Sequence, residues 1–241
     1  MLEFGFRSDT GRVRDINQDA FFVMPDERIF LVADGVGGHN DGELASRTVM
    51  ADIAEYAKEK PLPEEADDET VKNYFENVIR SVNTHIYDMA RKNAPGGMAT
   101  TLVSLYLKGA KAYAANVGDS RIYQIRDGGI TQITEDHTYV NSLVKEGIIT
   151  KEQGKTHPDR NMITRAIGAE KDVKPDLFIF DVKEGDILLL CTDGLYNEVS
   201  DQELCELLSS AVDMRTACSD LIDKANRRGG ADNITAVSVR V

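Results

Sequence analysis

The 241-residue sequence has no tryptophan, only three cysteines and four histidines, and few positive charges for its many acidic residues. Three cysteines do not make a disulfide framework, so we expect reduced thiols and a cytoplasmic protein. Cys218 shares an apolar helical face with Met214 and Leu221, which indicates a core residue rather than a nucleophile. Zinc is disfavoured because no ligand spacing links the histidines, which are His39, His85, His137 and His157.

Positive charge is in deficit relative to negative charge. Lys and Arg number 28 against 41 Asp and Glu, a formal net charge of −13. This excess argues against a nucleic-acid partner and against attraction to anionic membranes. No apolar run approaches the length of a membrane span, and the N-terminal MLEFGFRSDTGRVRD is charged where a signal peptide is apolar, so we expect no membrane insertion. If the substrate is anionic, something must offset the acidic charge.

Apolar periodicity predicts both strands and helices. Strands are expected at 20–24, 29–34, 99–107, 111–117, 121–126, 130–134, 176–182, 186–193 and 233–241. Helices are expected at 43–58, at about 71–89, and twice between 200 and 230. The short connections KG, GDS, DGG and KEG predict hairpins and therefore antiparallel sheets. Because the helices come in pairs rather than one per strand, we expect an α+β fold with helices stacked outside the sheets, in one domain.

Four Asp-Gly pairs raise the question of which aspartates mark only a turn. Asp127 joins two alternating strands, and a plain hairpin explains it. Asp34 and Asp193 instead follow the unbroken apolar runs IFLVA and ILLLCT, so each is predicted to end a strand that is buried on both faces. A carboxylate in such a place is costly unless it is paired, so two of them favour a site over two turns.

Further aspartates lie at similar strand edges, namely Asp19, Asp119 and Asp232. If these edges converge, the carboxylates cannot all be ionised without cations. Aspartates with water select hard ions, here magnesium or manganese, which would also turn an acidic hollow into an anion receptor. Arg14 is a natural clamp for a phosphate, with an ordinary surface arginine as the alternative. For Asp119 the alternative is a local turn.

Five segments together resemble a known family. SDTGRVRDINQD, VADGVGGHNDGELAS, ANVGDSRIY, CTDGL and GGADNIT resemble motifs of the metal-dependent protein phosphatases of type 2C, in particular the bacterial branch. They occur in the order of that family and span nearly the whole chain. The resemblance implies a four-layer α-β-β-α sandwich, with two central antiparallel sheets flanked by pairs of helices. It also implies a single catalytic domain over 1–241, with a mobile flap at about 138–165.

The resemblance further implies hydrolysis of phosphoserine and phosphothreonine in proteins by a metal-bridging water or hydroxide. Two tightly bound Mn²⁺ or Mg²⁺ ions would be held by Asp34, the Gly35 carbonyl, Asp193 and Asp232. Asp19 would act largely through bound waters, and Asp119 would help to hold a weaker third ion. Arg14 would grip the phosphate.

One position departs from the family pattern. Many eukaryotic members have a histidine, a candidate general acid, where this chain has Val36, which has no proton to donate. As partners we expect phosphorylated proteins, including a bacterial Ser/Thr kinase and its targets, and we expect a monomer. The alternatives are an inactive phosphatase-like module that binds phosphoproteins or a regulator, and a calcium-binding domain. Loss of metal aspartates would favour the inactive module, and none is lost. A calcium-binding domain needs a regular ligand loop, which the sequence lacks.

Overall fold

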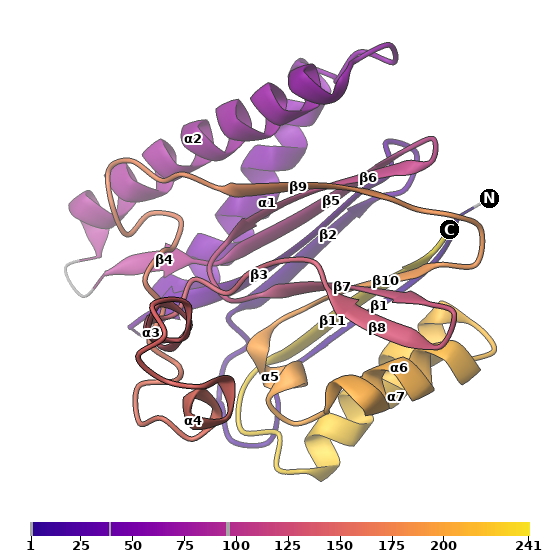
Figure 1. Cartoon of the computed structure of the whole chain (residues 1–241). Helices are drawn as coiled ribbons and strands as arrows, with labels where there is room; N and C mark the ends of the chain where they lie inside the picture. The colour runs from indigo at the N-terminus through magenta and orange to yellow at the C-terminus, as the bar shows by residue number, and fades with distance from the viewer. Residues whose placement is uncertain (1, 39, 95–96) are drawn as a thin grey trace.

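The computed structural model describes residues 2–38, 40–94 and 97–241 and arranges them in four layers. Two antiparallel sheets pack face to face between two pairs of helices (Figure 1). This is the four-layer α+β sandwich that the motifs imply.

The first sheet has the strand order β1-β11-β10-β7-β8, and the second has the order β2-β3-β5-β6-β9, with β4 paired to β3. The first contains β1 (Glu3–Asp9), β7 (Arg121–Arg126), β8 (Gly129–Gln132), β10 (Ile187–Cys191) and β11 (Ile234–Arg240). The second contains β2 (Asp19–Met24), β3 (Ile29–Gly37), β4 (Met98–Thr100), β5 (Leu102–Lys108), β6 (Lys111–Val117) and β9 (Asp176–Asp181). The acidic strand ends of interest belong to both sheets.

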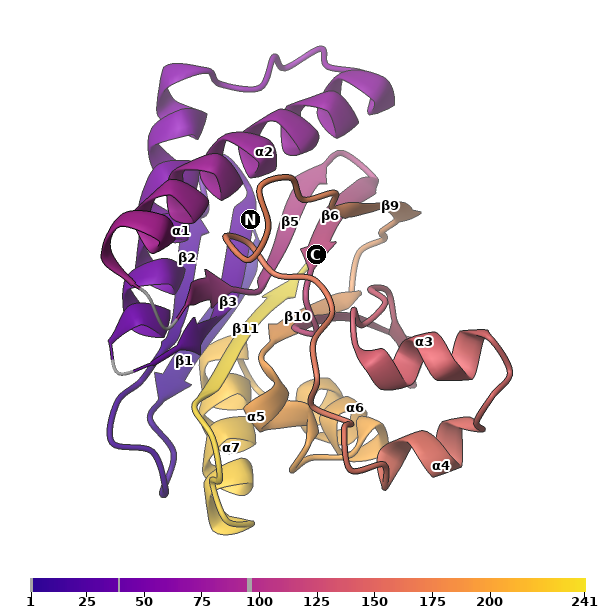
Figure 2. The same cartoon turned by 90° about the vertical axis from the view of Figure 1, so that its left-hand side faces the viewer.

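The helices cover the outer faces of the sheets. The second sheet is covered by α1 (Asp41–Glu59) and α2 (Asp68–Asn93), and the first by α6 (Asp201–Ser210) and α7 (Met214–Arg227). A capping box of Ser200 and Glu203 opens α6. The segment 138–165 contains α3 (Tyr139–Lys145) and α4 (Lys151–Lys155), which project beside the sandwich (Figure 2). A single turn, α5 (Asp193–Tyr196), follows β10.

Burial on both faces explains the unbroken apolar strands. In β10, Leu188 and Leu190 pack between the two sheets, while Leu189 faces α6 and α7. In β3, Phe30 lies between the sheets, while Leu31 packs towards α1 and α2. Each inner strand therefore contributes to two apolar layers, as its sequence predicts.

Two of the predicted hairpins are right and two are wrong, and the KG connection forms the hairpin of β5 and β6 as expected. β7 and β8 form the expected hairpin, and Asp127 and Gly128 have φ angles of 52° and 77°, both positive as a type I′ turn requires. The KEG connection instead joins β9 of the second sheet to β10 of the first, and GDS likewise carries the chain from β6 to β7 across the sandwich. The pattern misleads here because apolar strands with short connections look the same within one sheet and between two. The sequence also gave no strand prediction for β1, which pairs with β11.

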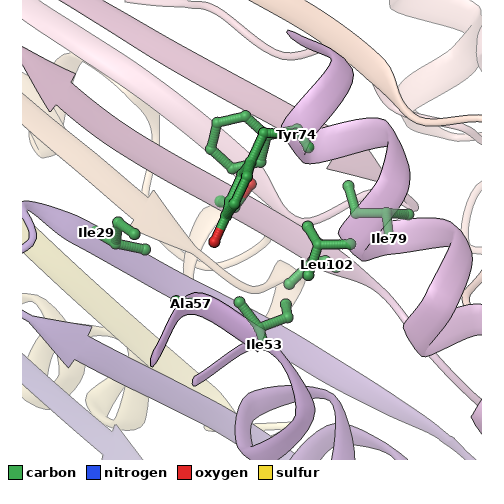
Figure 3. Close-up of a pocket in the computed structure, with 9 residues that line it drawn as sticks. Ile29, Ile53, Ala57, Tyr74, Ile79 and Leu102 are labelled. Carbon is green, nitrogen blue, oxygen red and sulfur yellow. The ribbon is translucent and has the colours of Figure 1, made fainter. Parts of the chain in front are cut away.

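A small cavity of about 10 Å³ lies between the first helix pair and the second sheet (Figure 3). It is large enough for about one water molecule, so it is a packing void rather than a substrate site. Its lining contains none of the predicted site residues and consists of Ile29, Ile53, Ala57, Tyr74, Phe75, Val78, Ile79, Leu102 and Ser104. Across the described residues, no helix combines the length and apolarity needed to cross a membrane.

Candidate active site

The acidic site is built around two carboxylates on neighbouring strands. Asp19 opens β2 and lies directly opposite Asp34 in β3. Asp34 does not end its strand, as the sequence had suggested, because β3 continues to Gly37 and Gly35 pairs with Thr100 of β4. A Cβ on Gly35 would lie 2.1 Å from the carbonyl oxygen of Gly42, at the start of α1. Only glycine fits there, and its Asp-Gly pair is an extended strand rather than a turn.

Asp19 connects the two sheets. Its Oδ2 accepts hydrogen bonds from the hydroxyls of Thr192, after β10, and Thr235, in β11, at 2.8 and 2.7 Å. Its Oδ1 is buried and has no hydrogen-bond partner among the residues that the structure describes. Such an oxygen is costly to bury alone, and a water or a cation would satisfy it.

Asp193 and Asp232 bring the first sheet into the same site. Asp193 is the first residue of α5, and its Oδ1 is also buried, with no hydrogen-bond partner in the described part of the chain. Asp232 precedes β11, and its Oδ2 accepts a hydrogen bond from Nη2 of Arg14 at 2.8 Å. That bond raises the pKa of Arg14, and the charges of Asp34 and Asp193 act in the same direction. Arg14 therefore stands at the edge of the acidic group, with its side chain 54 % exposed.

Burial and mutual repulsion oppose ionisation of these carboxyls. Burial first, and then the charges of Asp19 and Asp193, raise the pKa of Asp34 well above its usual value. Burial also raises the pKa of Asp19 to about 7 and that of Asp193 to about 6. The pKa of Asp119 is raised to about 7, by burial and then by the charge of Asp193. The predicted residues therefore lie within electrostatic reach of one another, and bound cations would favour their ionised forms.

Asp119 lies in the connection that crosses from β6 to β7 and is only 7 % exposed. Its backbone carbonyl accepts a hydrogen bond from the Tyr196 hydroxyl at 3.0 Å. The preceding Gly118 donates its N–H to Nδ1 of the buried His137 at 3.0 Å. Asp119 is thus on a fixed inter-sheet crossing, not at the tip of a hairpin.

The donor chemistry of the site suits a hard divalent cation. Carboxylate oxygens and a backbone carbonyl are ligands that Mg²⁺ and Mn²⁺ accept. The unpartnered oxygens of Asp19 and Asp193 are further acceptors without a donor. Within residues 2–38, 40–94 and 97–241, the His, Cys, Asp and Glu side chains form no group of three or more that could hold a metal ion by themselves. A ligand set here therefore requires other oxygens, such as the Gly35 carbonyl and water.

Several supporting residues escaped prediction. The hydroxyls of Thr192 and Thr235 bind Asp19, and the available signal was that each threonine lies within three residues of a candidate aspartate. Tyr196 follows Asp193 by one helical turn and gave no signal of its own. Of the four histidines, which showed no ligand spacing in the sequence, His39 lies outside the described residues.

Comparison with known proteins agrees with this fold. A family model described as "Protein phosphatase 2C" matches residues 11–230. The serine/threonine phosphatase stp of Listeria monocytogenes is 37 % identical, over 97 % of this chain and 94 % of its own length. The serine/threonine phosphatase of S. agalactiae superposes with a TM-score of 0.92 at 33 % identity, covering 100 % of both chains. The catalytic domain of PstP, solved in complex with 2 manganese ions, gives a TM-score of 0.85 at 35 % identity, covering 99 % of this chain and 97 % of that one.

The chain belongs to the protein phosphatase 2C family of metal-dependent serine/threonine protein phosphatases. This confirms the resemblance drawn from the five motifs. It also favours an active hydrolase over the inactive binding module, because the relatives are named as phosphatases and this chain retains every motif aspartate.

Proposed function

We propose that this protein removes phosphate from phosphoserine and phosphothreonine in proteins at the site formed by Asp19, Asp34, Asp193 and Asp232. The observation that carries the proposal is the pairing of Asp19 with Asp34 on adjacent strands, beside an arginine that is still half-exposed. Bound cations would offset the repulsion between these carboxylates. The exposed guanidinium beside them could then bind an anion such as a phosphate.

In this proposal, Asp34, the Gly35 carbonyl, Asp193 and Asp232 hold two Mn²⁺ or Mg²⁺ ions, and Asp119 helps to hold a weaker third. Support comes from the oxygen-only donor set and from the manganese pair in the PstP catalytic domain. When bound, such ions supply a water nucleophile and neutralise charge on the phosphoryl group. Asp19 presents its unpartnered oxygen towards this centre and acts through water.

The protein's own groups then have distinct tasks. Arg14 binds the phosphoryl oxygens through its planar fork, and its hydrogen bond to Asp232 orients the guanidinium beforehand. Thr192 and Thr235 fix the orientation of Asp19. Val36 is 43 % exposed and has no proton to give, so a water or another group must protonate the leaving oxygen of the substrate.

We also propose that residues 1–241 form one catalytic domain, with 138–165 as a flap beside the substrate. The expected setting is a cytoplasmic monomer that acts on a bacterial Ser/Thr kinase and its targets. The three cysteines are free and buried, which supports a reducing compartment. The excess of acidic residues supports partners other than nucleic acid.

Hydrolysis of p-nitrophenyl phosphate, with and without Mn²⁺, tests the function. We expect turnover only with the metal, and loss of turnover in Asp193→Ala. Asp127→Asn is the matched control, because its Asp-Gly pair forms a hairpin turn outside the candidate site and asparagine tolerates the positive φ of that turn. Metal-independent turnover, or full activity of Asp193→Ala at saturating Mn²⁺, would contradict the proposal.

A further inference from the structure

One short helix contacts two of the candidate metal ligands. α5 begins at Asp193 and ends at Tyr196. The hydroxyl of Tyr196 donates to the backbone carbonyl of Asp119 at 3.0 Å. The same helical turn therefore carries one carboxylate and holds the peptide group of the other.

The ring of Tyr196 packs against the side chain of Arg121. The Arg121 guanidinium carbon lies 3.5 Å from the ring centroid, close enough for a cation–π contact. Arg121 is in turn fixed by Asp136, whose carboxylate accepts three hydrogen bonds of 2.7 to 3.1 Å from it. Nη1 of Arg121 also donates to the Tyr123 hydroxyl at 2.8 Å. An aromatic ring packed in this way has little freedom to move its hydroxyl.

The other side of the Asp119 turn is tied to the second sheet. The Ser120 and Thr101 hydroxyls form a hydrogen bond of 2.7 Å, and Thr101 Oγ1 accepts the N–H of Asp34 at 2.9 Å. The turn therefore sits between the strand that carries Asp34 and the helix that carries Asp193. The Tyr196 bond is its link to the helix.

We propose that Tyr196 is a positioning residue that fixes the distance of Asp119 from Asp193, so that both carboxylates can face one bound ion. The inference rests on the proposed function, because it takes Asp119 as a ligand of the weaker third ion. Two carboxylates of like charge that face one place repel each other. A flexible crossing would let the turn relax away from α5, whereas the Tyr196 hydroxyl keeps it in place.

The test is Tyr196→Phe, which removes one oxygen and keeps the ring over Arg121. Tyr113→Phe is the matched control, because the Tyr113 hydroxyl also donates to one oxygen, that of Asp68 in α2, but contacts no site residue. Both variants are compared with the unaltered chain in three measurements. These are the Ser120 amide resonance by ¹⁵N NMR without metal, Mn²⁺ titration by calorimetry, and steady-state kinetics on p-nitrophenyl phosphate and a phosphothreonine peptide.

We expect Tyr196→Phe to shift the Ser120 amide, which shares a peptide bond with the Asp119 carbonyl, and to weaken the third Mn²⁺ site about 2- to 10-fold, the worth of one hydrogen bond. The two tight sites should keep their affinity. At limiting Mn²⁺, kcat should fall while KM stays within about twofold, and added Mn²⁺ should restore kcat. A loss of packing alone would lower stability in both variants and would not respond to added metal.

Tyr196→Phe would overturn the inference if it left the Ser120 amide and the weak site unchanged in a chain that binds Mn²⁺ and turns over. Equal effects of Tyr196→Phe and Tyr113→Phe on the weak site would overturn it as well. An unaltered chain that neither binds Mn²⁺ nor hydrolyses phosphate would instead contradict the proposed function. The Ser120 amide needs no metal and would still report whether Tyr196 fixes the turn.

Discussion

Asp19 and Asp34 lie directly opposite each other on β2 and β3, so two carboxylates face one another across adjacent strands. Like charges in this position destabilise a sheet, and here burial adds to the cost. This pairing stabilises the protein only when cations or protons neutralise it. The acidic site therefore lowers the stability of the fold unless bound cations or protons neutralise its charge.

Replacing Asp34 should therefore separate stability from activity. We expect Asp34→Ala to lower turnover by roughly 100-fold or more, since a charge-stabilising group is lost from the reacting centre. The metal-free protein should unfold at an equal temperature or up to a few degrees higher, because one buried like charge is gone. Mn²⁺ should raise the melting temperature of the unaltered chain more than that of the variant. Thermal unfolding with and without Mn²⁺, beside activity, measures this.

Asp127→Asn provides the control for Asp34→Ala. Its Asp-Gly pair is a surface hairpin turn, and asparagine tolerates the positive φ of 52° at that position. Activity and the response to Mn²⁺ should both stay unchanged. A metal response in Asp34→Ala as large as in the unaltered chain would refute the ligand role of Asp34.

Arg14 should matter for the substrate and not for the fold. Because its ion pair with Asp232 is solvent-exposed, losing it should change stability by at most about 1 kcal/mol. We expect Arg14→Ala to raise KM for a phosphopeptide and to lower kcat, giving a fall in kcat/KM of about 10-fold or more. Arg14→Lys should recover little of this, because lysine lacks the planar fork.

The neighbouring exposed Arg12 provides a matched control for Arg14. It is in the same loop, and Arg12→Ala removes an equal charge without touching Asp232. If Arg12→Ala and Arg14→Ala lowered kcat/KM equally, the effect would be general electrostatic attraction. If neither changed it, Arg14 would be an ordinary surface arginine.

Much of this site could be predicted because strand burial and chemistry agree in the sequence. The apolar runs before Asp34 and Asp193 indicated strands buried on both faces, and those strands lie inside the two sheets. The alternating strands around Asp127 indicated a hairpin, which is present. A carboxylate that follows a strand buried on both faces indicates a candidate site, whereas a carboxylate in a surface hairpin indicates only a turn.

The residues that support the site could not be predicted in the same way. The roles of Tyr196 and Arg121 depend on the β6–β7 connection crossing between sheets, and a local pattern does not reveal which sheet a strand joins. The same ambiguity produced the wrong hairpin between β9 and β10. Asp34 was placed at a strand end because Asp-Gly favours turns, whereas the contact of Gly35 with α1 is tertiary.

Asp119 should be separable from the metal pair. We expect Asp119→Ala to keep two tight metal sites in a calorimetric titration and to lose the weak one. Turnover should fall more on a phosphopeptide than on p-nitrophenyl phosphate, because the peptide hydroxyl is the poorer leaving group and Val36 has no proton to supply. An equal loss on both substrates would remove the link to leaving-group protonation. If the weak metal site were unchanged in Asp119→Ala, Asp119 would not be a metal ligand and would serve only in the turn.

Asp186, in the connection between β9 and β10, forms a charge pair with Arg126 of β7, and the contribution of this pair to stability depends on pH. Asp186 is only 1 % exposed and precedes β10, and its Oδ1 accepts the Nε–H of Arg126 at 2.8 Å. Burial acts to raise the pKa of Asp186, but the hydrogen bonds from Arg126 and from the Lys183 N–H outweigh it. The pKa therefore lies below the usual 3.8. The folded protein therefore stabilises the ionised form of Asp186.

Asp186→Asn should lower the free energy of unfolding at pH 7 by about 1–2 kcal/mol, as expected when hydrogen bonds to a charged group become neutral ones. Because the folded pKa is depressed, the contribution of Asp186 is fully present above pH 3.8 and is lost as the pH falls through the folded value. The difference between the variant and the unaltered chain should thus stay constant from pH 7 to about pH 5 and shrink below pH 4. Urea unfolding at pH 7, 5, 4 and 3 measures this difference.

Asp127→Asn is the comparison, because it removes the exposed pair with Lys183 in the same region and should cost at most about 1 kcal/mol at any pH. A difference for Asp186→Asn that did not change between pH 7 and pH 3 would mean that its charge contributes nothing to stability.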